Sequence, residues 1–257
     1  MKKISLLLVA AMLVLFLAAC GTDSSNGSGG DGEGTVYKVG IDTTYPPFEY
    51  EENGEYHGID IDLFTAIAEN QGFEFEFDAM DFGGIIPAME AGQLDVAIAG
   101  MSITDERKKV VDFSDPYFDA GITLVVNKDN DDIESVEDLE GKTVAVKNGT
   151  TGAKFAMDNA DKYGYEIVQF DDSPAMFQEV SNGNADALLE DYPVIAYAIA
   201  QDNLDLKIVG DRLNGDQYGI AVIKGENQDL LEKINAGLQE LRDSGEYDKI
   251  VNKYLGE

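Results

Sequence analysis

The sequence is poor in the residues that most catalytic and metal-binding chemistry uses. Its 257 residues include no Trp, one Cys (Cys20) and one His (His57), which excludes a disulfide framework, a Cys/His zinc site and a Cys–His nucleophile pair. Basic residues are also few: Lys and Arg number 18 against 50 Asp and Glu, which gives a formal net charge of −32. This charge has the wrong sign for binding nucleic acid or anionic lipid headgroups.

The remaining composition is that of a globular protein. Apolar residues make up 44% of the chain, which is enough for a hydrophobic core, and a chain of this length more often forms two compact units than one. We expect neither a metal nor a cofactor.

The first nineteen residues have the pattern of a signal peptide. Residues 1–3 are short and basic, and residues 4–19 are almost entirely apolar, a run that is too short for a membrane span of about 20 residues. Residues 17–20 (Leu-Ala-Ala-Cys) resemble the lipobox of bacterial lipoproteins, in which the cysteine is lipidated and becomes the mature N-terminus. A retained signal anchor with an incidental cysteine is the alternative.

A flexible tether is predicted after the signal peptide, over residues 20–35. Residues 21–34 contain six Gly and three Ser and no large apolar side chain, a composition that cannot bury surface. With Cys20 lipidated, no free thiol remains to be oxidised outside the cytoplasm. We therefore expect an extracytoplasmic domain that lipid on Cys20 anchors to the outer face of the cell membrane.

The rest of the chain alternates short apolar runs with amphipathic stretches, which is typical of an α/β fold. A strand is predicted at residues 37–41. Apolar residues recur at helical spacing over residues 60–71, which Gly72 ends, and over residues 230–241, which Gly245 ends.

One pattern occurs twice. Residues 86–100 and residues 173–191 both predict a helix begun by a proline, then a glycine, an aspartate three residues later and an apolar strand. Chance similarity of a common helix-to-strand turn is the alternative. We interpret the pattern as one supersecondary unit that is used in two lobes.

Polar residues follow four of the predicted strands, at residues 42–45, 100–107, 147–151 and 190–191. In open α/β sheets the ligand binds outside the carboxyl ends of the strands. Two of these four ends belong to each predicted lobe, so we expect the ligand to bind between the lobes.

Arg107 is the most informative residue in these segments. It lies in the first turn of a predicted helix that Thr104 could cap, where a cation opposes the helix dipole. A planar guanidinium binds a carboxylate through two parallel hydrogen bonds, which indicates an anion-binding role. The alternative is a solvated member of the basic run at residues 107–109.

The other polar candidates carry similar alternatives. Lys147 precedes a predicted helix N-terminus at Thr151, whose free N–H groups favour an anion, although a solvated loop lysine would have the same surroundings in sequence. The acids Asp42, Glu190 and Asp191 could be surface residues in a chain with 50 acids. The aromatic residues Tyr45 and Phe82 could belong to the core. We assign no chemistry to His57.

Five sequence strings in this order resemble the polar amino-acid-binding proteins of ABC importers, solute-binding protein family 3. They are residues 42–48 (DTTYPPF), 58–62 (GIDID), 101–107 (MSITDER), 112–117 (DFSDPY) and 141–146 (GKTVAV). The resemblance extends from residue 36 to the C-terminus.

The resemblance implies a non-catalytic protein with a two-lobe periplasmic-binding-protein fold of type II, which closes around one ligand. The chain would cross between the lobes twice, near residues 117–121 and 215–219. The first lobe would comprise residues 36–118 and 218–257, and the second lobe residues 119–217. The implied partners are a free L-amino acid and an ABC importer permease.

The resemblance also implies roles for ten residues. The α-carboxylate of the ligand would be bound by Arg107 and by the backbone N–H groups of Ser102 and Thr151. The α-ammonium would be bound by the Gly100 carbonyl, the Ser102 hydroxyl and Asp191. The side chain of the ligand would stack on Tyr45 and Phe82, and its tip would lie toward Asp42, Lys147 and Glu190.

The tip residues bear on specificity. Asp42 and Glu190 against Lys147 leave a net charge of −1 there, which a guanidinium would complement, whereas a neutral amide would satisfy the mixture of donors and acceptors. The whole set of strings, including residues 146–150 (VKNGT), looks closest to glutamine-type proteins, so glutamine is the first expectation and a basic amino acid, arginine or lysine, the second. Two other classes are less favoured: a dehydratase with Glu190 as its acid or base, and a sensor domain.

Overall fold

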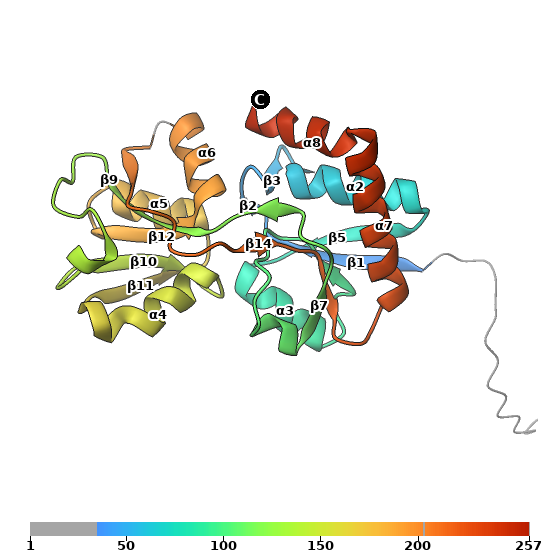
Figure 1. Ribbon diagram of the computed structural model, residues 1–257, viewed down its shortest axis with the longest axis horizontal. Helices are drawn as coiled ribbons and strands as arrows, with labels where there is room; N and C mark the ends of the chain where they lie inside the picture. The colour runs from blue at the N-terminus through green and yellow to red at the C-terminus, as the bar shows by residue number, and fades with distance from the viewer. Residues whose placement is uncertain (1–34, 203, 257) are drawn as a thin grey trace, which may run out of the picture. The chain divides into compact units, whose positions relative to one another are not determined.

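The computed structural model of the protein describes residues 35–202 and 204–256. The predicted signal peptide, Cys20 and the tether up to residue 34 lie outside these residues. Within the described ranges, no helix is both long enough and apolar enough to cross a membrane. Two five-stranded sheets with helices packed on them form the two lobes of an α/β fold (Figure 1).

The first lobe contains the sheet with strand order β5-β1-β6-β15-β7. Strand β1 is parallel to β5 and β6, whereas β15 is antiparallel to β6 and β7. The strands are β1 (Val36–Ile41), β5 (Glu74–Ala79), β6 (Val96–Ala97), β7 (Val111–Phe113) and β15 (Ala221–Ile223). The helices of this lobe are α2 (Ile59–Gln71), α3 (Phe82–Glu90), α7 (Gln228–Ser244) and α8 (Glu246–Leu255). A small sheet adds β2 (Thr44–Tyr45), β3 (Glu49–Glu52) and β4 (Glu55–His57).

The second lobe contains the sheet with strand order β11-β10-β12-β9-β13. Strand β10 is parallel to β11 and β12, and β9 is antiparallel to β12 and β13. The strands are β9 (Ile122–Asn127), β10 (Thr143–Lys147), β11 (Glu166–Phe170), β12 (Ala187–Asp191) and β13 (Leu206–Val209). The helices are α4 (Thr151–Tyr163), α5 (Ser173–Ser181), α6 (Tyr192–Asp202) and the 3₁₀ turn η2 (Val136–Asp138).

The two sheets confirm that one supersecondary unit occurs in both lobes. Helix α3 leads into β6 beside β1, and helix α5 leads into β12 beside β10, at equivalent positions of the two sheets. The prediction that both helices begin at a proline was wrong for α3, which begins at Phe82 and contains Pro87 in its interior. Pro87 lacks the N–H that would bond to Gly83, so the helix continues with one hydrogen bond fewer.

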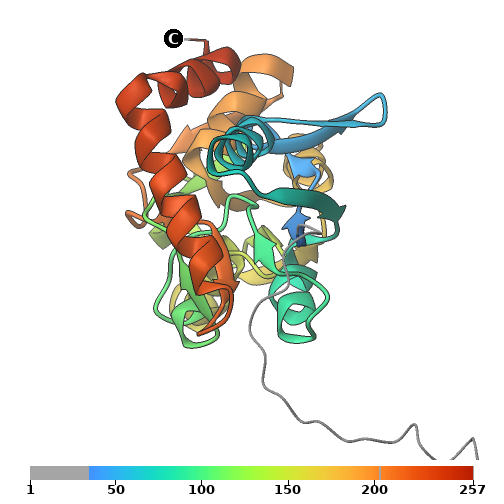
Figure 2. The ribbon, with the colours of Figure 1, turned by 90° about the vertical axis from the view of Figure 1, so that its right-hand side faces the viewer.

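The strand β1 and the helices α2 and α7 confirm the predictions made for residues 37–41, 60–71 and 230–241. Gly72 and Gly245 end the two helices in the left-handed conformation that favours glycine. Helix α7 packs closely on α2 because a Cβ on Gly237 would lie 2.9 Å from Ile67. Figure 2 shows α7 and α8, in red, along one side of this lobe.

Two segments connect the lobes, and they lie side by side (Figure 1). Strand β8 (Phe118–Asp119) pairs with the antiparallel strand β14 (Gln217–Tyr218). The expected two-lobe fold with two crossings is therefore present, while the exact lobe limits, residues 36–118 with 218–257 and residues 119–217, stay a prediction.

Candidate ligand-binding site

Residues from both lobes line a partly open cavity at the carboxyl ends of the central strands, with an empty volume of about 250 Å³ that includes space open to solvent. Eight of the ten predicted site residues line it, together with Thr150. The lining residues are Tyr45, Phe82, Gly100, Ser102, Arg107, Lys147, Thr150, Thr151 and Asp191. The other two predicted residues, Asp42 and Glu190, bond to Lys147 and Tyr45 of the wall. The ligand contacts assigned to these residues stay predictions.

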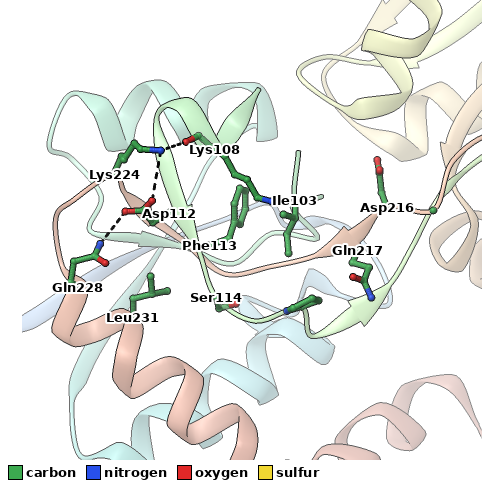
Figure 3. Close-up of a pocket in the computed structure, with 12 residues that line it drawn as sticks. Ile103, Lys108, Asp112, Phe113, Ser114, Asp216, Gln217, Lys224, Gln228 and Leu231 are labelled. Carbon is green, nitrogen blue, oxygen red and sulfur yellow. Dashed lines mark hydrogen bonds and ion pairs between the residues drawn. The ribbon is translucent and has the colours of Figure 1, made fainter. Parts of the chain in front are cut away.

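A larger and more open groove, with an empty volume of about 1340 Å³, runs along the first lobe and the second crossing (Figure 3). Its polar groups bond to one another: Lys224 Nζ lies 4.0 Å from Asp112 Oδ1, and Gln228 Nε2 donates to Asp112 Oδ2 at 3.1 Å. Because these groups are paired, few of them are available to a solute. We therefore place the candidate site in the smaller cavity between the lobes.

Asp42 and Lys147 form a buried ion pair that joins the two lobes. Asp42 follows β1 and is 2% exposed, and Lys147 is 1% exposed. The Thr44 N–H and hydroxyl donate to Asp42 Oδ1 at 2.9 and 2.7 Å, and Lys147 Nζ lies 4.9 Å from the centroid of the Tyr45 ring. The cavity is thus lined by an ammonium group whose charge a neighbouring carboxylate already balances.

Arg107 also lines the cavity and contacts both lobes. The predicted helix around it is a single 3₁₀ turn, η1 (Arg107–Lys109), and the Arg107 N–H donates to Thr104 Oγ1 at 3.1 Å. The guanidinium donates to the Ser102 carbonyl at 2.7 Å and to the Gly149 carbonyl at 3.0 Å, and it lies 5.2 Å from the centroid of the Phe82 ring. These contacts hold a buried planar cation at the edge of the cavity.

Glu190 and Asp191 end strand β12 rather than following it as predicted, because the ladder with β9 continues through both residues. The Tyr45 hydroxyl lies 3.0 Å from Glu190 Oε1 and 3.1 Å from Asp191 Oδ2. Likewise, Lys147 is the last residue of β10 and pairs with Phe170 of β11. The polar residues therefore belong to the rigid sheet.

Burial decides the charge of the two adjacent acids. It raises the pKa of Glu190 to about 7, and the neighbouring Asp191 adds to this rise while Lys147 opposes it. Burial also raises the pKa of Asp191, although the hydroxyl groups of Tyr218 and Tyr45 favour its ionised form. Near neutral pH, Glu190 is thus charged in only part of the molecules.

Backbone N–H groups complete the wall at the start of helix α4. Thr150 caps this helix, because its Oγ1 accepts a hydrogen bond from the Ala153 N–H at 3.1 Å. Thr151 occupies the first helical position, as predicted, so its N–H has no partner within the helix. Such an N-terminus favours an anion.

Several contacts of the site escaped the sequence analysis. Ser173 donates to Glu190 Oε2 at 2.9 Å, and the Tyr218 hydroxyl donates to Asp191 Oδ2 at 2.7 Å. Ser173 begins helix α5 soon after β11, so the rule about strand ends could have found it. Tyr218 lies in the second crossing, and no local pattern marks a residue whose partners are distant in sequence.

Comparison with known proteins identifies the family. The model of the bacterial extracellular solute-binding proteins, family 3, matches residues 37–257. The chain belongs to this family. This result confirms the resemblance found in the sequence, and the chain is an amino-acid-binding solute-binding protein of the ABC importer class. The family also indicates an extracytoplasmic location.

Individual relatives agree with this assignment. The arginine-binding extracellular protein ArtP of Bacillus subtilis (strain 168) is 34% identical over 256 residues, which cover 99% of this chain and 98% of the relative. An ancestral arginine-binding protein bound to arginine matches with a TM-score of 0.80 and 49% identity over 85% of this chain and 97% of the other. An ancestral arginine-binding protein bound to glutamine matches with a TM-score of 0.79 and 50% identity over 86% of this chain and 98% of the other.

Proposed function

We propose that this protein captures a free polar L-amino acid, glutamine before arginine or lysine, and delivers it to the permease of an ABC importer. The observation that carries the choice of glutamine is the buried pair of Lys147 and Asp42 at the cavity. Because Asp42 balances the charge of Lys147, the ion pair repels a cationic ligand less than an unpaired ammonium would. The pair gives such a ligand no net attraction either.

In this proposal the ligand's α-carboxylate binds to Arg107 and to the N–H groups of Ser102 and Thr151. The α-ammonium binds to Asp191, the Gly100 carbonyl and the Ser102 hydroxyl. Arg107 and Asp191 belong to different lobes, so binding of both ends of the amino acid favours the closed arrangement. Residues of both lobes line the cavity, so we expect the lobes to separate for ligand entry and release.

Glutamine also matches the polar groups around Lys147. Its side-chain carbonyl would accept a hydrogen bond from Lys147 Nζ, and its amide N–H groups would donate to the acids near the tip, Asp42 and Glu190. Stacking of the aliphatic part on Tyr45 and Phe82 needs no charge. Calorimetric titration with glutamine, arginine, lysine and leucine tests the proposal, and tighter binding of leucine than of any polar amino acid would contradict it.

Arginine is the second candidate, and two observations favour it. Glu190 adds a negative charge near the tip when it is ionised. In addition, an ancestral arginine-binding protein about half identical to this chain was solved with arginine, although one bound to glutamine is equally similar. Tighter binding of arginine than of glutamine in the same titration would exchange the order of the two ligands.

The pH dependence should separate the two ligands. Because the pKa of Glu190 lies at about 7, its carboxyl is mostly protonated at pH 6 and mostly ionised at pH 8. A cationic ligand binds the ionised form better, so the affinity for arginine should rise by up to about tenfold from pH 6 to pH 8. The affinity for glutamine, which has no net charge, should change much less.

The variant Glu190→Gln provides the control for this experiment. It removes the titrating group and keeps side-chain oxygen and nitrogen atoms for the contacts with Ser173 and Tyr45. In this variant the dependence of arginine binding on pH should be lost. An unchanged rise in arginine affinity would show that another group, such as Asp191, causes the effect.

We also propose that lipid on Cys20, which lies outside the described residues, anchors the protein to the membrane. The substitution Cys20→Ala should release the protein from the membrane fraction of the native host, because no other residue of the tether can be acylated through a thiol. The control Ser24→Ala, in the same tether, should leave the protein at the membrane. An unmodified Cys20 in the intact mass of the native protein would contradict the proposal.

A further inference from the structure

Two buried acids of the first lobe, Glu49 and Asp60, have no role in the proposed ligand contacts. Glu49 lies on β3 in register with Tyr45 of β2, and Asp60 lies in the first turn of α2. Both side chains are 0% exposed. A buried acid without a cation normally costs several kcal/mol if it stays charged, so this pair needs a physical explanation.

Most oxygen atoms of the pair have no donor. Within the described part of the chain, no N–H or O–H group donates to either oxygen of Glu49 or to Asp60 Oδ1. The nearby cation Lys147 is bonded to Asp42 instead. Two carboxylates placed in this way would repel each other, whereas one shared proton would supply the missing donor.

The other oxygen of Asp60 is well bonded. Asp60 Oδ2 accepts a hydrogen bond from the Gly100 N–H at 2.8 Å and another from the Tyr117 hydroxyl at 2.8 Å. Gly100 has a φ of 52°, and a Cβ there would lie 2.7 Å from the Tyr45 ring. Asp60 therefore fixes the backbone of a glycine that lines the site, and it connects this glycine to Tyr117, next to strand β8 of the first crossing.

We propose that Glu49 carries a proton at neutral pH and donates it to Asp60 Oδ1, and that this acid pair is a positioning element, which holds the Gly100 carbonyl in place for the ligand's α-ammonium. The positioning role deepens the proposed function and rests on it. The proton on Glu49 gives Asp60 Oδ1 a hydrogen-bond donor while Asp60 itself stays ionised. Asp60 Oδ2 therefore stays a strong acceptor for the Gly100 N–H.

The electrostatics of the pair agree with this arrangement. Burial, followed by the charges of Asp60 and Asp42, raises the pKa of Glu49 well above its usual range, and only Lys147 opposes the rise. Burial raises the pKa of Asp60 to about 6, while its bonds to Gly100, Glu49 and Tyr117 favour the ionised form. At neutral pH the pair thus holds one proton, and Glu49 is the acid that keeps it.

Infrared difference spectroscopy tests for the proton directly. The variant Glu190→Gln serves as the background, because Glu190 has a pKa of about 7 and would itself be partly protonated. At neutral pH this background protein, labelled with isotopic glutamate, should show the carbonyl band of a protonated carboxylic acid, and the band should be absent once Glu49→Gln is added. The matched control is Glu51→Gln, an exposed acid on the same strand, which should keep the band. Absence of the band from the Glu190→Gln background would overturn the proposal.

Ligand affinity tests the positioning role. Glu49→Gln keeps an N–H donor for Asp60 Oδ1, so its affinity for glutamine should stay within about threefold of the wild type. Glu49→Leu removes the donor, so Asp60 takes up the proton itself and becomes a weaker acceptor for Gly100; the affinity should fall by about tenfold or more. Equal affinities of these two folded variants would overturn the positioning role.

The two measurements fail in different ways. If the wild-type protein bound no amino acid, the proposed function and the positioning role would both be wrong, and the infrared band would still decide whether the proton is shared. If Glu49→Leu did not fold, Glu49→Gln would carry the test, because a loss of affinity by more than about tenfold in this variant would contradict the role assigned to its donor.

Discussion

Replacement of Arg107 by Ala should lower the affinity for glutamine by roughly 30-fold to several thousand-fold. In the proposed closed complex the guanidinium pairs with the buried α-carboxylate, so its removal leaves a ligand charge without a partner, which costs on the order of 2–5 kcal/mol. The substitution Asp191→Asn should have an effect of similar size, because the α-ammonium then loses its carboxylate. Isothermal titration calorimetry measures both.

The conservative substitution Arg107→Lys should also lose much of the affinity. Arg107 is held by two carbonyl groups, of Ser102 and Gly149, which fix the plane of its guanidinium. A lysine provides a point charge and cannot form the two parallel hydrogen bonds to a carboxylate.

The matched control for these variants is Asp105→Ala, an exposed acid two residues before Arg107, which should bind glutamine as the wild type does. Small-angle X-ray scattering with and without glutamine should show closure in the wild type and in the control only. An affinity near that of the wild type in Arg107→Ala or Asp191→Asn would mean that the two ends of the ligand bind elsewhere.

The sequence predicts the fold well where local patterns determine it. Apolar residues at helical spacing predict α2 and α7, and the glycines that end these helices adopt the left-handed conformation that favours glycine. The predicted start of α3 at Pro87 is wrong, because a proline inside a helix removes only one hydrogen bond and the helix begins earlier, at Phe82. Local signals therefore locate the elements more reliably than their ends.

The candidate site was predictable for a different reason. The parallel strands β1, β6, β10 and β12 end at the cavity, so the residues at their ends come together even though they lie far apart in the sequence. The rule fails for Tyr218, whose contact with Asp191 depends on the pairing of β8 with β14. It also fails for Glu49 and Asp60, because burial of an acid cannot be read from its neighbours along the chain.

The substitution Lys147→Met should have the second large effect, a loss of glutamine affinity of roughly 100-fold or more. Methionine has a similar length but no charge, so Asp42 would stay buried in the closed arrangement without its cation, and removal of one partner of a buried ion pair costs about 3–5 kcal/mol. The lobes can avoid this cost by separating, because the pair joins Asp42 of the first lobe to Lys147 of the second.

A second ion pair between the lobes supplies the control. Lys154 Nζ lies 3.5 Å from Glu106 Oε2, with side chains that are 57% and 63% exposed, and such surface pairs contribute about 0–1 kcal/mol. Lys154→Met should therefore change glutamine affinity by less than about fivefold. Scattering should show that the ligand-free wild type is more compact than ligand-free Lys147→Met.

The double variant Asp42→Asn with Lys147→Met removes the unpaired charge, so it should recover the compact form. It should not recover the affinity, because the donor for the ligand's side chain is still missing. Glutamine binding by Lys147→Met within threefold of the wild type would show that the buried pair neither favours closure nor contacts the ligand.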